Sequence, residues 1–109
     1  MKNILLTLAL LISGVSFGQT AKEYYDRGFS KVNLRDFSGA ISDYTKEIEI
    51  NPNSAEAYIN RAISKAQLGN KKGACEDVMK VKEMVRLGAF EDKLLLEYKA
   101  GEVRKVVCD

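Results

Sequence analysis

The chain has 109 residues, of which 46% are hydrophobic and 29% are charged, and its formal net charge is +2. This length and composition are typical of one globular domain and exclude a disordered tail. The chain has no histidine and only two cysteines, and charges of both signs are mixed along it. We therefore expect no metal site, no cofactor and no nucleic-acid partner, because the side chains or the basic patch that these need are missing.

Residues 1–18 have the layout of a secretory signal peptide. Lys2 gives a positive start, residues 4–12 are almost entirely apolar, and small residues precede the expected cleavage between Gly18 and Gln19. We expect export to the periplasm or secretion from the cell. The apolar run is shorter than the roughly 20 residues that span a bilayer, and no cysteine directly follows the cleavage site, so no membrane anchor is expected. The alternative is a buried N-terminal helix.

The rest of the chain is predicted to form successive helices with short turns. Thr20 and Glu23 form a capping box, Asp36 is placed to cap a second helix, and Asn53 or Ser54 can cap a third one after a turn at Pro52. The expected helices span about residues 21–34, 37–50, 55–68 and 71–86. Helices joined by such short turns lie antiparallel, so the sequence predicts two helical hairpins.

The two hairpins are copies of one unit with a period of 34 residues. Residues 21–54 align with residues 55–88 without a gap. The identical pairs are Ala21/Ala55, Tyr24/Tyr58, Arg27/Arg61, Ser30/Ser64, Lys31/Lys65, Leu34/Leu68, Gly39/Gly73, Ala40/Ala74, Asp43/Asp77, Lys46/Lys80 and Glu49/Glu83. A helix-turn-helix period of this length is the signature of one family of solenoids.

The repeat resembles that of the tetratricopeptide repeat (TPR) family. The residues that carry the resemblance are Tyr24, Gly28, Ala40, Ile41, Tyr44 and Pro52 in the first unit, and Tyr58, Ala62, Gly69 and Ala74 in the second. The resemblance implies an all-α, TPR-type α-solenoid in residues 19–109, with repeats at 21–54 and 55–88 and a capping segment at 89–109. The small residues would let the two helices of each hairpin approach closely.

The chain departs from the family pattern near the end of each second helix. The family usually has a small residue where this chain has Glu47 and Val81, and the second unit has Arg86 where the first has Pro52. The fourth helix is therefore free to run on past the usual stop.

The capping segment, residues 89–109, is expected to form at least one helix that covers the exposed end of the second repeat. The apolar residues expected on its inner face are Phe90, Leu94, Leu95, Tyr98 and Val106. The pair Ala100-Gly101 weakens a helix, so the sequence leaves open whether residues 102–107 continue it.

In the TPR family the first helix of each repeat lines a concave face that takes an extended or helical peptide. The resemblance implies a groove lined by Tyr25, Phe29, Val32, Asn33, Ile59, Ile63 and Gln67. Four of them would form an apolar stripe larger than solvent exposure favours, namely Tyr25, Phe29, Ile59 and Ile63. Family members that bind chaperones grip a C-terminal carboxylate with Lys and Asn where this chain has Tyr25 and Phe29, so we expect a partner with an apolar segment instead.

The expected function is a non-enzymatic protein–protein interaction module, an adaptor or scaffold in the periplasm or outside the cell. No enzyme is expected, because the chain lacks a nucleophile motif and a glycine-rich phosphate loop. Two alternatives stay open. The capping helix or a loop covers the apolar stripe, or the module associates with its own copy as a structural part of the cell envelope.

Two charged pairs occupy equivalent places in the two repeats. Arg27 and Asp43 lie 16 residues apart, as do Arg61 and Asp77, and each pair puts one charge on either helix of a hairpin. We expect intra-hairpin salt bridges that fix the register of the helices, rather than a ligand site.

The only two cysteines, Cys75 and Cys108, are expected to form a disulfide, because export would place them in an oxidising compartment. A straight capping helix that starts near Gly88 would carry Cys108 about 9 Å too far. The bond therefore requires a later start of that helix or a break at Ala100-Gly101. The alternatives are free thiols or a bridge between two chains.

Overall fold

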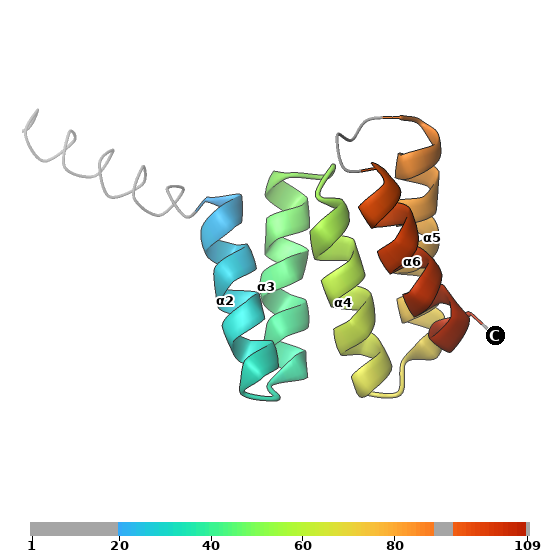
Figure 1. The fold of residues 1–109 in the computed structure, drawn as a ribbon. Coiled ribbons are helices and arrows are strands. Elements are labelled where there is room, and N and C mark those ends of the chain that lie inside the picture. The colour runs from blue at the N-terminus through green and yellow to red at the C-terminus, as the bar shows by residue number, and fades with distance from the viewer. Residues whose placement is uncertain (1–19, 89–92, 109) are drawn as a thin grey trace, which may run out of the picture.

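The computed structural model describes residues 20–88 and 93–108, which form five helices in an antiparallel array (Figure 1). The helices are α2 (Ala21–Asn33), α3 (Phe37–Ile50), α4 (Ala55–Gln67), α5 (Lys71–Arg86) and α6 (Lys93–Val107). The all-α prediction is confirmed, and the first four helices match the expected ones to within a residue at either end. The expected signal peptide, residues 1–18, lies outside the described residues.

Each of the first four helices begins with a side chain that accepts a hydrogen bond from the backbone three residues further on. Thr20 Oγ1 accepts from the Glu23 amide at 3.1 Å, and Asp36 Oδ1 accepts from the Gly39 amide at 3.0 Å. Ser54 and Asn70 do the same for α4 and α5. These caps satisfy amides that have no partner inside a helix, so local sequence fixes where each helix starts.

The turns that close the two hairpins have the same shape but different residues. Gly69 ends the first helix of the second hairpin with φ of 84°, a left-handed conformation that glycine adopts at no steric cost. The equivalent residue in the first hairpin is Arg35, with φ of 60°. The first hairpin therefore makes the same turn without a glycine.

Small residues sit where the helices of each hairpin pack. Ala40, Ala62 and Ala74 are fully buried, and Gly28 faces the ring of Tyr44 so closely that a Cβ atom at residue 28 would lie 2.9 Å from Tyr44 Cε1. Packing at such short range excludes a larger side chain at any of these positions. The small residues of the repeat thus set the spacing of α2 from α3 and of α4 from α5.

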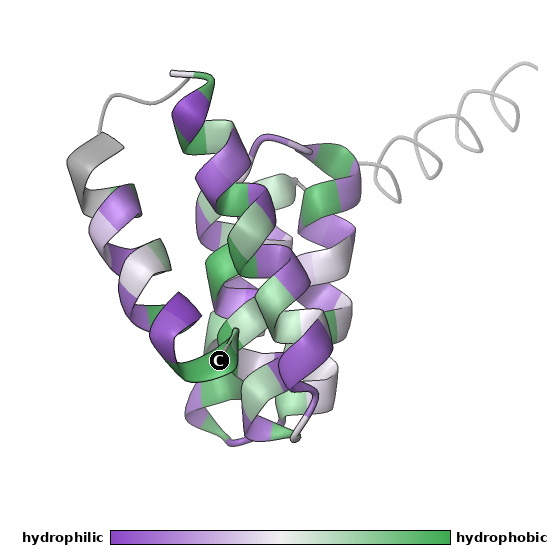
Figure 2. Cartoon of the chain, turned by 90° about the vertical axis from the view of Figure 1, so that its right-hand side faces the viewer, coloured by the Kyte–Doolittle hydropathy of each residue, from purple (hydrophilic) through white to green (hydrophobic). Residues whose placement is uncertain are grey.

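Helix α6 closes the array against both α4 and α5. It runs unbroken through Ala100 and Gly101, so residues 102–107 are helical. Figure 2 looks onto α5 and α6 from the end of the array. Because α6 starts as late as Lys93 in the described structure, Cys108 comes level with Cys75 without a break in the helix.

The inner face of α6 is not the one expected from the sequence. The buried side chains are Leu96, Ala100 and Val107, whereas Tyr98 and Val106 are 67% and 66% exposed. Ala100 has no side chain beyond Cβ, so its face can approach both α4 and α5, which the bulkier face cannot. Phe90 lies outside the described residues, and the side chains of Leu94 and Leu95 are likewise not described.

The core consists of two clusters of buried residues. The larger one joins α4, α5 and α6 around Val78 and Val81, and the smaller one joins α3 and α4 around Tyr44. Among residues 20–88 and 93–108, no helix has the length and apolar character needed to cross a membrane.

Candidate peptide-binding groove

The residues expected to line a groove come from α2 and α4, and the structure leaves most of them accessible. Phe29 on α2 and Ile63 on α4 occupy equivalent repeat positions and are 53% and 37% exposed. Asn33 and Gln67, also equivalent, are exposed near the C-terminal ends of the same helices. Equivalent residues of successive hairpins therefore present a row of matching side chains.

Ile59 does not belong to this accessible row. It is only 2% exposed and is part of the core cluster with Ala55 and Val78. The reason is α6, which packs beside α4 and covers its surface at this level. Helix α6 therefore covers part of the expected apolar stripe, as one alternative anticipated, but leaves Phe29 and Ile63 open.

Tyr25 and Val32 form the half-buried margin of the row on α2. The Tyr25 ring lies edge-on to the Tyr44 ring with centroids 5.9 Å apart, and the Tyr25 hydroxyl accepts a hydrogen bond from Asn60 Nδ2 at 3.1 Å. Val32 packs against the smaller core cluster. The Tyr25–Asn60 bond joins α2 to α4, so it holds the two hairpins in a fixed relation across the groove.

Helix α6 forms a further wall beside α4. A pocket of about 370 Å³ lies between α4 and α6. Its lining residues are Glu56, Ile59, Asn60, Ile63, Tyr98, Lys99, Glu102 and Val103. Tyr98, expected in the core, lines this pocket together with Ile63 and is 67% exposed, and Phe29, the repeat equivalent of Ile63, is exposed on α2. We call these three residues the apolar row.

The charges around the apolar row are paired with one another. Lys99 Nζ lies 2.9 Å from Glu56 Oε1 and so ties α6 to α4, and this hydrogen bond raises the pKa of Lys99 above its usual value. Two further pairs lie within helices, Lys22–Asp26 at 2.7 Å and Lys105–Glu102 at 2.8 Å. The groove therefore has both signs of charge in balance and no cluster of one sign.

The two charged pairs expected inside the hairpins lie away from the apolar row. Arg61 donates two hydrogen bonds to Asp77, at 2.9 and 2.7 Å, and Lys65 lies 3.0 Å from the same carboxylate. In the first hairpin Arg27 comes only within 3.6 Å of Asp43, whose closer partner is Lys31 at 2.8 Å. Both aspartates are buried, and each joins the two helices of its hairpin.

Glu47 is a buried acid without a complete set of partners. It is 4% exposed, and its Oε2 accepts no hydrogen bond from the described part of the chain. Burial raises the pKa of Glu47, and the Ser54 hydroxyl opposes this shift in part. Burial also raises the pKa of the neighbouring Tyr44 to about 12, so that hydroxyl stays neutral. Glu47 faces the packed interior rather than the groove.

Cys75 on α5 and Cys108 after α6 form a disulfide, with their Cα atoms 4.9 Å apart. Both residues are half-buried. The bond closes the open end of the larger core cluster, where Val107 is also buried. It therefore fixes the C-terminal end of α6 on the second hairpin.

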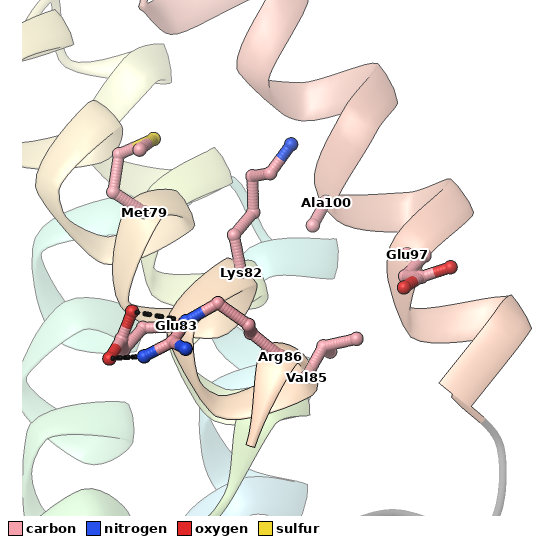
Figure 3. A pocket seen from close by; sticks show the side chains of 7 residues that line it. All are labelled: Met79, Lys82, Glu83, Val85, Arg86, Glu97 and Ala100. Carbon is pink, nitrogen blue, oxygen red and sulfur yellow. Dashed lines mark hydrogen bonds and ion pairs between the residues drawn. The ribbon is translucent and has the colours of Figure 1, made fainter. Parts of the chain in front are cut away.

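A second pocket, of about 680 Å³, lies between α5 and α6 (Figure 3). Its lining mixes apolar side chains such as Met79 and Val85 with charged ones, of which Arg86 pairs with Glu83 at 2.8 Å. In the described ranges 20–88 and 93–108, no group of three or more acidic, cysteine or histidine side chains gathers as a metal site would need.

The fold is an α-solenoid of the helical-repeat class. It consists of two helical hairpins with the same 34-residue period and a fifth helix that covers the end of the second hairpin. No family model matches the chain. It is similar to a tetratricopeptide repeat protein 36 homolog of Nematostella vectensis, with 38% identity over 64 residues that cover 59% of this chain and 35% of that protein.

The chain is also similar to the small glutamine-rich tetratricopeptide repeat-containing protein beta of Homo sapiens, with 33% identity over 52% of this chain and 19% of that protein. A third relative is the small glutamine-rich tetratricopeptide repeat-containing protein 2 of Mycosarcoma maydis, with 35% identity over 52% of this chain and 16% of that protein. The chain thus spans about a third or less of the length of these relatives. Over about half of its residues it is similar to tetratricopeptide repeat proteins.

Proposed function

We propose that the protein is a TPR-type interaction module that binds a peptide or an extended segment of another protein along the groove formed by α2, α4 and α6. The observation that carries the proposal is the apolar row, in which Phe29, Ile63 and Tyr98 stay accessible on three helices of one face. Exposed aromatic and aliphatic side chains in a hollow surface are the usual anchors of peptide binding. The similarity to tetratricopeptide repeat proteins supports a non-enzymatic binding role.

The site of action we propose is an oxidising compartment, the periplasm or the outside of the cell. The Cys75–Cys108 disulfide supports this, because such bonds persist mainly in exported proteins. N-terminal sequencing of protein taken from the producing cells provides the test. A mature start at Gln19 in the exported fraction supports export, whereas a chain that keeps Met1 in the cytoplasmic fraction contradicts it.

Selection of random peptides displayed on phage tests the binding function. The bait is the oxidised protein, and the counter-bait is the Phe29→Asp/Ile63→Asp double variant, whose two changes lie on exposed positions and should leave the fold intact. We expect enriched peptides with large apolar side chains that bind the protein and not the double variant. Absence of enrichment, or equal binding to both baits, would contradict the proposal.

A second copy of the chain is the alternative occupant of the groove, since the same apolar row would be buried in a self-associating module. Light scattering over a range of protein concentrations distinguishes a peptide-binding monomer from a self-associating module. A monomer at all concentrations supports a groove that is free for a peptide. Association that the Phe29→Asp/Ile63→Asp double variant abolishes would instead assign the row to self-contact.

A further inference from the structure

The pocket between α4 and α6 depends on a helix that the chain fastens at its end. Four of its lining residues lie on α4, and the other four, from Tyr98 to Val103, lie on α6. Neither helix makes the pocket alone. The covalent tie that keeps α6 beside the rest of the array is the Cys75–Cys108 bond.

We propose that this α4–α6 pocket takes one large uncharged side chain of the bound peptide, and that the Cys75–Cys108 bond regulates it by holding α6 in place. Reduction of the bond by a dithiol would then lower the affinity for the peptide. The proposal rests on the peptide-binding function proposed above and adds the chemistry and the regulation of one part of that site.

The lining of the pocket defines the chemistry of its occupant. Its apolar lining consists of Ile59 and Ile63 on α4 and of Val103 and Tyr98 on α6. Ile59 is buried, and Tyr98 is largely exposed. The charged lining residues are neutralised within the protein, Lys99 by Glu56 and Glu102 by Lys105. A charged side chain would lose its hydration in this pocket without gaining an unpaired counter-charge, so an uncharged leucine-like or phenylalanine-like side chain fits best.

Besides the disulfide, packing against α4 and α5 and one ion pair hold α6 in place. Leu96, Ala100 and Val107 are its buried residues in the described structure, and the Lys99–Glu56 pair is about 40% exposed on both sides, where ion pairs contribute little. A terminal helix can open at a lower free energy than the rest of a protein, and the disulfide opposes such opening because it closes the 33-residue loop between Cys75 and Cys108. Loss of the bond should therefore release α6 while α2–α5 stay folded.

The chemistry of the switch is ordinary thiol–disulfide exchange. A thiolate of the dithiol attacks one sulfur of the Cys75–Cys108 bond, and the resulting mixed disulfide is resolved by the second thiol of the same reductant. Cys75 and Cys108 become two thiols, which carry two protons, and the dithiol leaves as its own disulfide. Both cysteines are half-buried, so part of each residue is open to solvent and to a small reductant.

The test observes the whole nitrogen-15-labelled chain by nuclear magnetic resonance. The neutral probe is N-acetylleucinamide, and the control is N-acetylglycinamide, which has no side chain. We expect the leucine probe to shift the backbone signals of Ile63, Tyr98 and Val103 in the oxidised protein, and the glycine probe not to. After reduction, or in the Cys75→Ser/Cys108→Ser variant, the apparent Kd should rise at least about fivefold, the lower end of typical couplings between sites. Signals of α2–α5 should persist.

Two variants separate this inference from the proposed function. Ile63→Asp should abolish the shifts that the leucine probe causes, and Phe29→Asp, outside the pocket, should leave them unchanged. Equal Kd values in the oxidised and reduced protein overturn the regulation, as does loss of the α2–α5 signals on reduction. If phage-selected peptides bind but the leucine probe shifts none of the pocket residues, the pocket assignment fails and the proposed function stands.

Discussion

Arg61 holds the carboxylate of Asp77 with two hydrogen bonds, whereas Arg27, its equivalent in the first hairpin, stays 3.6 Å from Asp43. The difference arises from position in the array. Arg61 lies between two hairpins, where it also donates to Thr45 Oγ1 of α3 at 3.2 Å, and its side chain is 16% exposed. The first hairpin has no described neighbour on that side, and the Arg27 side chain is 50% exposed.

The two arginines should therefore contribute unequally to stability. Arg61→Met should lower the free energy of unfolding by about 1.5 to 3 kcal/mol, the range for hydrogen bonds to charged groups, because Asp77 stays buried. Arg27→Met, the matched control, should cost no more than about 1 kcal/mol, as is typical of exposed pairs. Urea unfolding of both variants measures this. Equal losses would show that the repeat position, and not the neighbouring hairpin, sets the strength of the pair.

Two glycines in helices should respond to alanine in opposite directions. Gly28→Ala places a Cβ atom 2.9 Å from Tyr44 Cε1 in a packed core, so we expect the free energy of unfolding to fall by about 1 to 3 kcal/mol. In the described structure no packing neighbour outside the local backbone of α6 lies within 4 Å of a Cβ atom placed on Gly101, so Gly101→Ala should stabilise α6 by about 0.5 to 1 kcal/mol through helix propensity. Thermal unfolding of the two variants measures both changes in stability. Stabilisation by Gly28→Ala would mean that Tyr44 moves freely, contrary to its burial.

Glu47 should make stability fall as pH rises. Its carboxyl has an ordinary pKa of 4.5, and burial raises this pKa in the folded chain. Below both pKa values Glu47 is protonated in both states and contributes nothing. Above 4.5 the unfolded chain releases the proton more readily, so the folded state is disfavoured and stays so at neutral pH.

The substitution Glu47→Gln removes this penalty and should stabilise the fold at pH 7.5 by about 1 kcal/mol, the order of the cost of a poorly satisfied buried polar group. The gain should vanish near pH 4. Glu49→Gln, on the exposed side of α3, is the control and should show no such pH dependence. A gain from Glu47→Gln that is the same at both pH values would contradict the assignment to the ionised carboxylate.

The disulfide should stabilise the packing of α6 against the second hairpin. It closes a loop of 33 residues, which corresponds to about 3 to 4 kcal/mol on the chain-entropy estimate. The purified oxidised protein should be a monomer two hydrogens lighter than its reduced form. Two alkylatable thiols in protein from an oxidising compartment, or a disulfide-linked dimer, would contradict a bond within one chain.

The helices and their order could be predicted because the signals for them are local. Caps such as Thr20 and Asp36 and the 34-residue period depend only on residues close in sequence, and the structure reproduces them. The place of Ile59 and of Tyr98 could not be predicted in this way. Ile59 is equivalent to Tyr25 by repeat position, yet it is buried because α6 packs beside α4, whereas among residues 20–88 and 93–108 no covering helix of this kind lies beside α2.

The orientation of α6 was the main unknown, because its sequence has two apolar faces. One contains Tyr98 and Val106, and the other contains Leu96, Ala100 and Val107. Residue size decides between them, since the face with Ala100 permits close packing and the bulkier one remains outside. A count of apolar residues does not contain this information, although the alanine at residue 100 is the signal that could have revealed it.

The apolar row is the proposed binding surface, and a comparison of two exposed apolar residues on different faces tests this assignment. Phe29→Ala removes a member of the row, and Met79→Ala removes a side chain of α5 that is 47% exposed. Both variants should change the melting temperature by no more than about 4 °C, as surface substitutions do.

Calorimetric titration with a phage-selected peptide measures the Kd of the protein and of both variants. We expect that Phe29→Ala weakens binding roughly tenfold, as is typical of an anchor worth about 1 to 2 kcal/mol, while Met79→Ala leaves the Kd unchanged. An unchanged Kd for Phe29→Ala, or a weakened one that comes with a large loss of thermal stability, would contradict this assignment, because Phe29 would then be a bystander or part of the core.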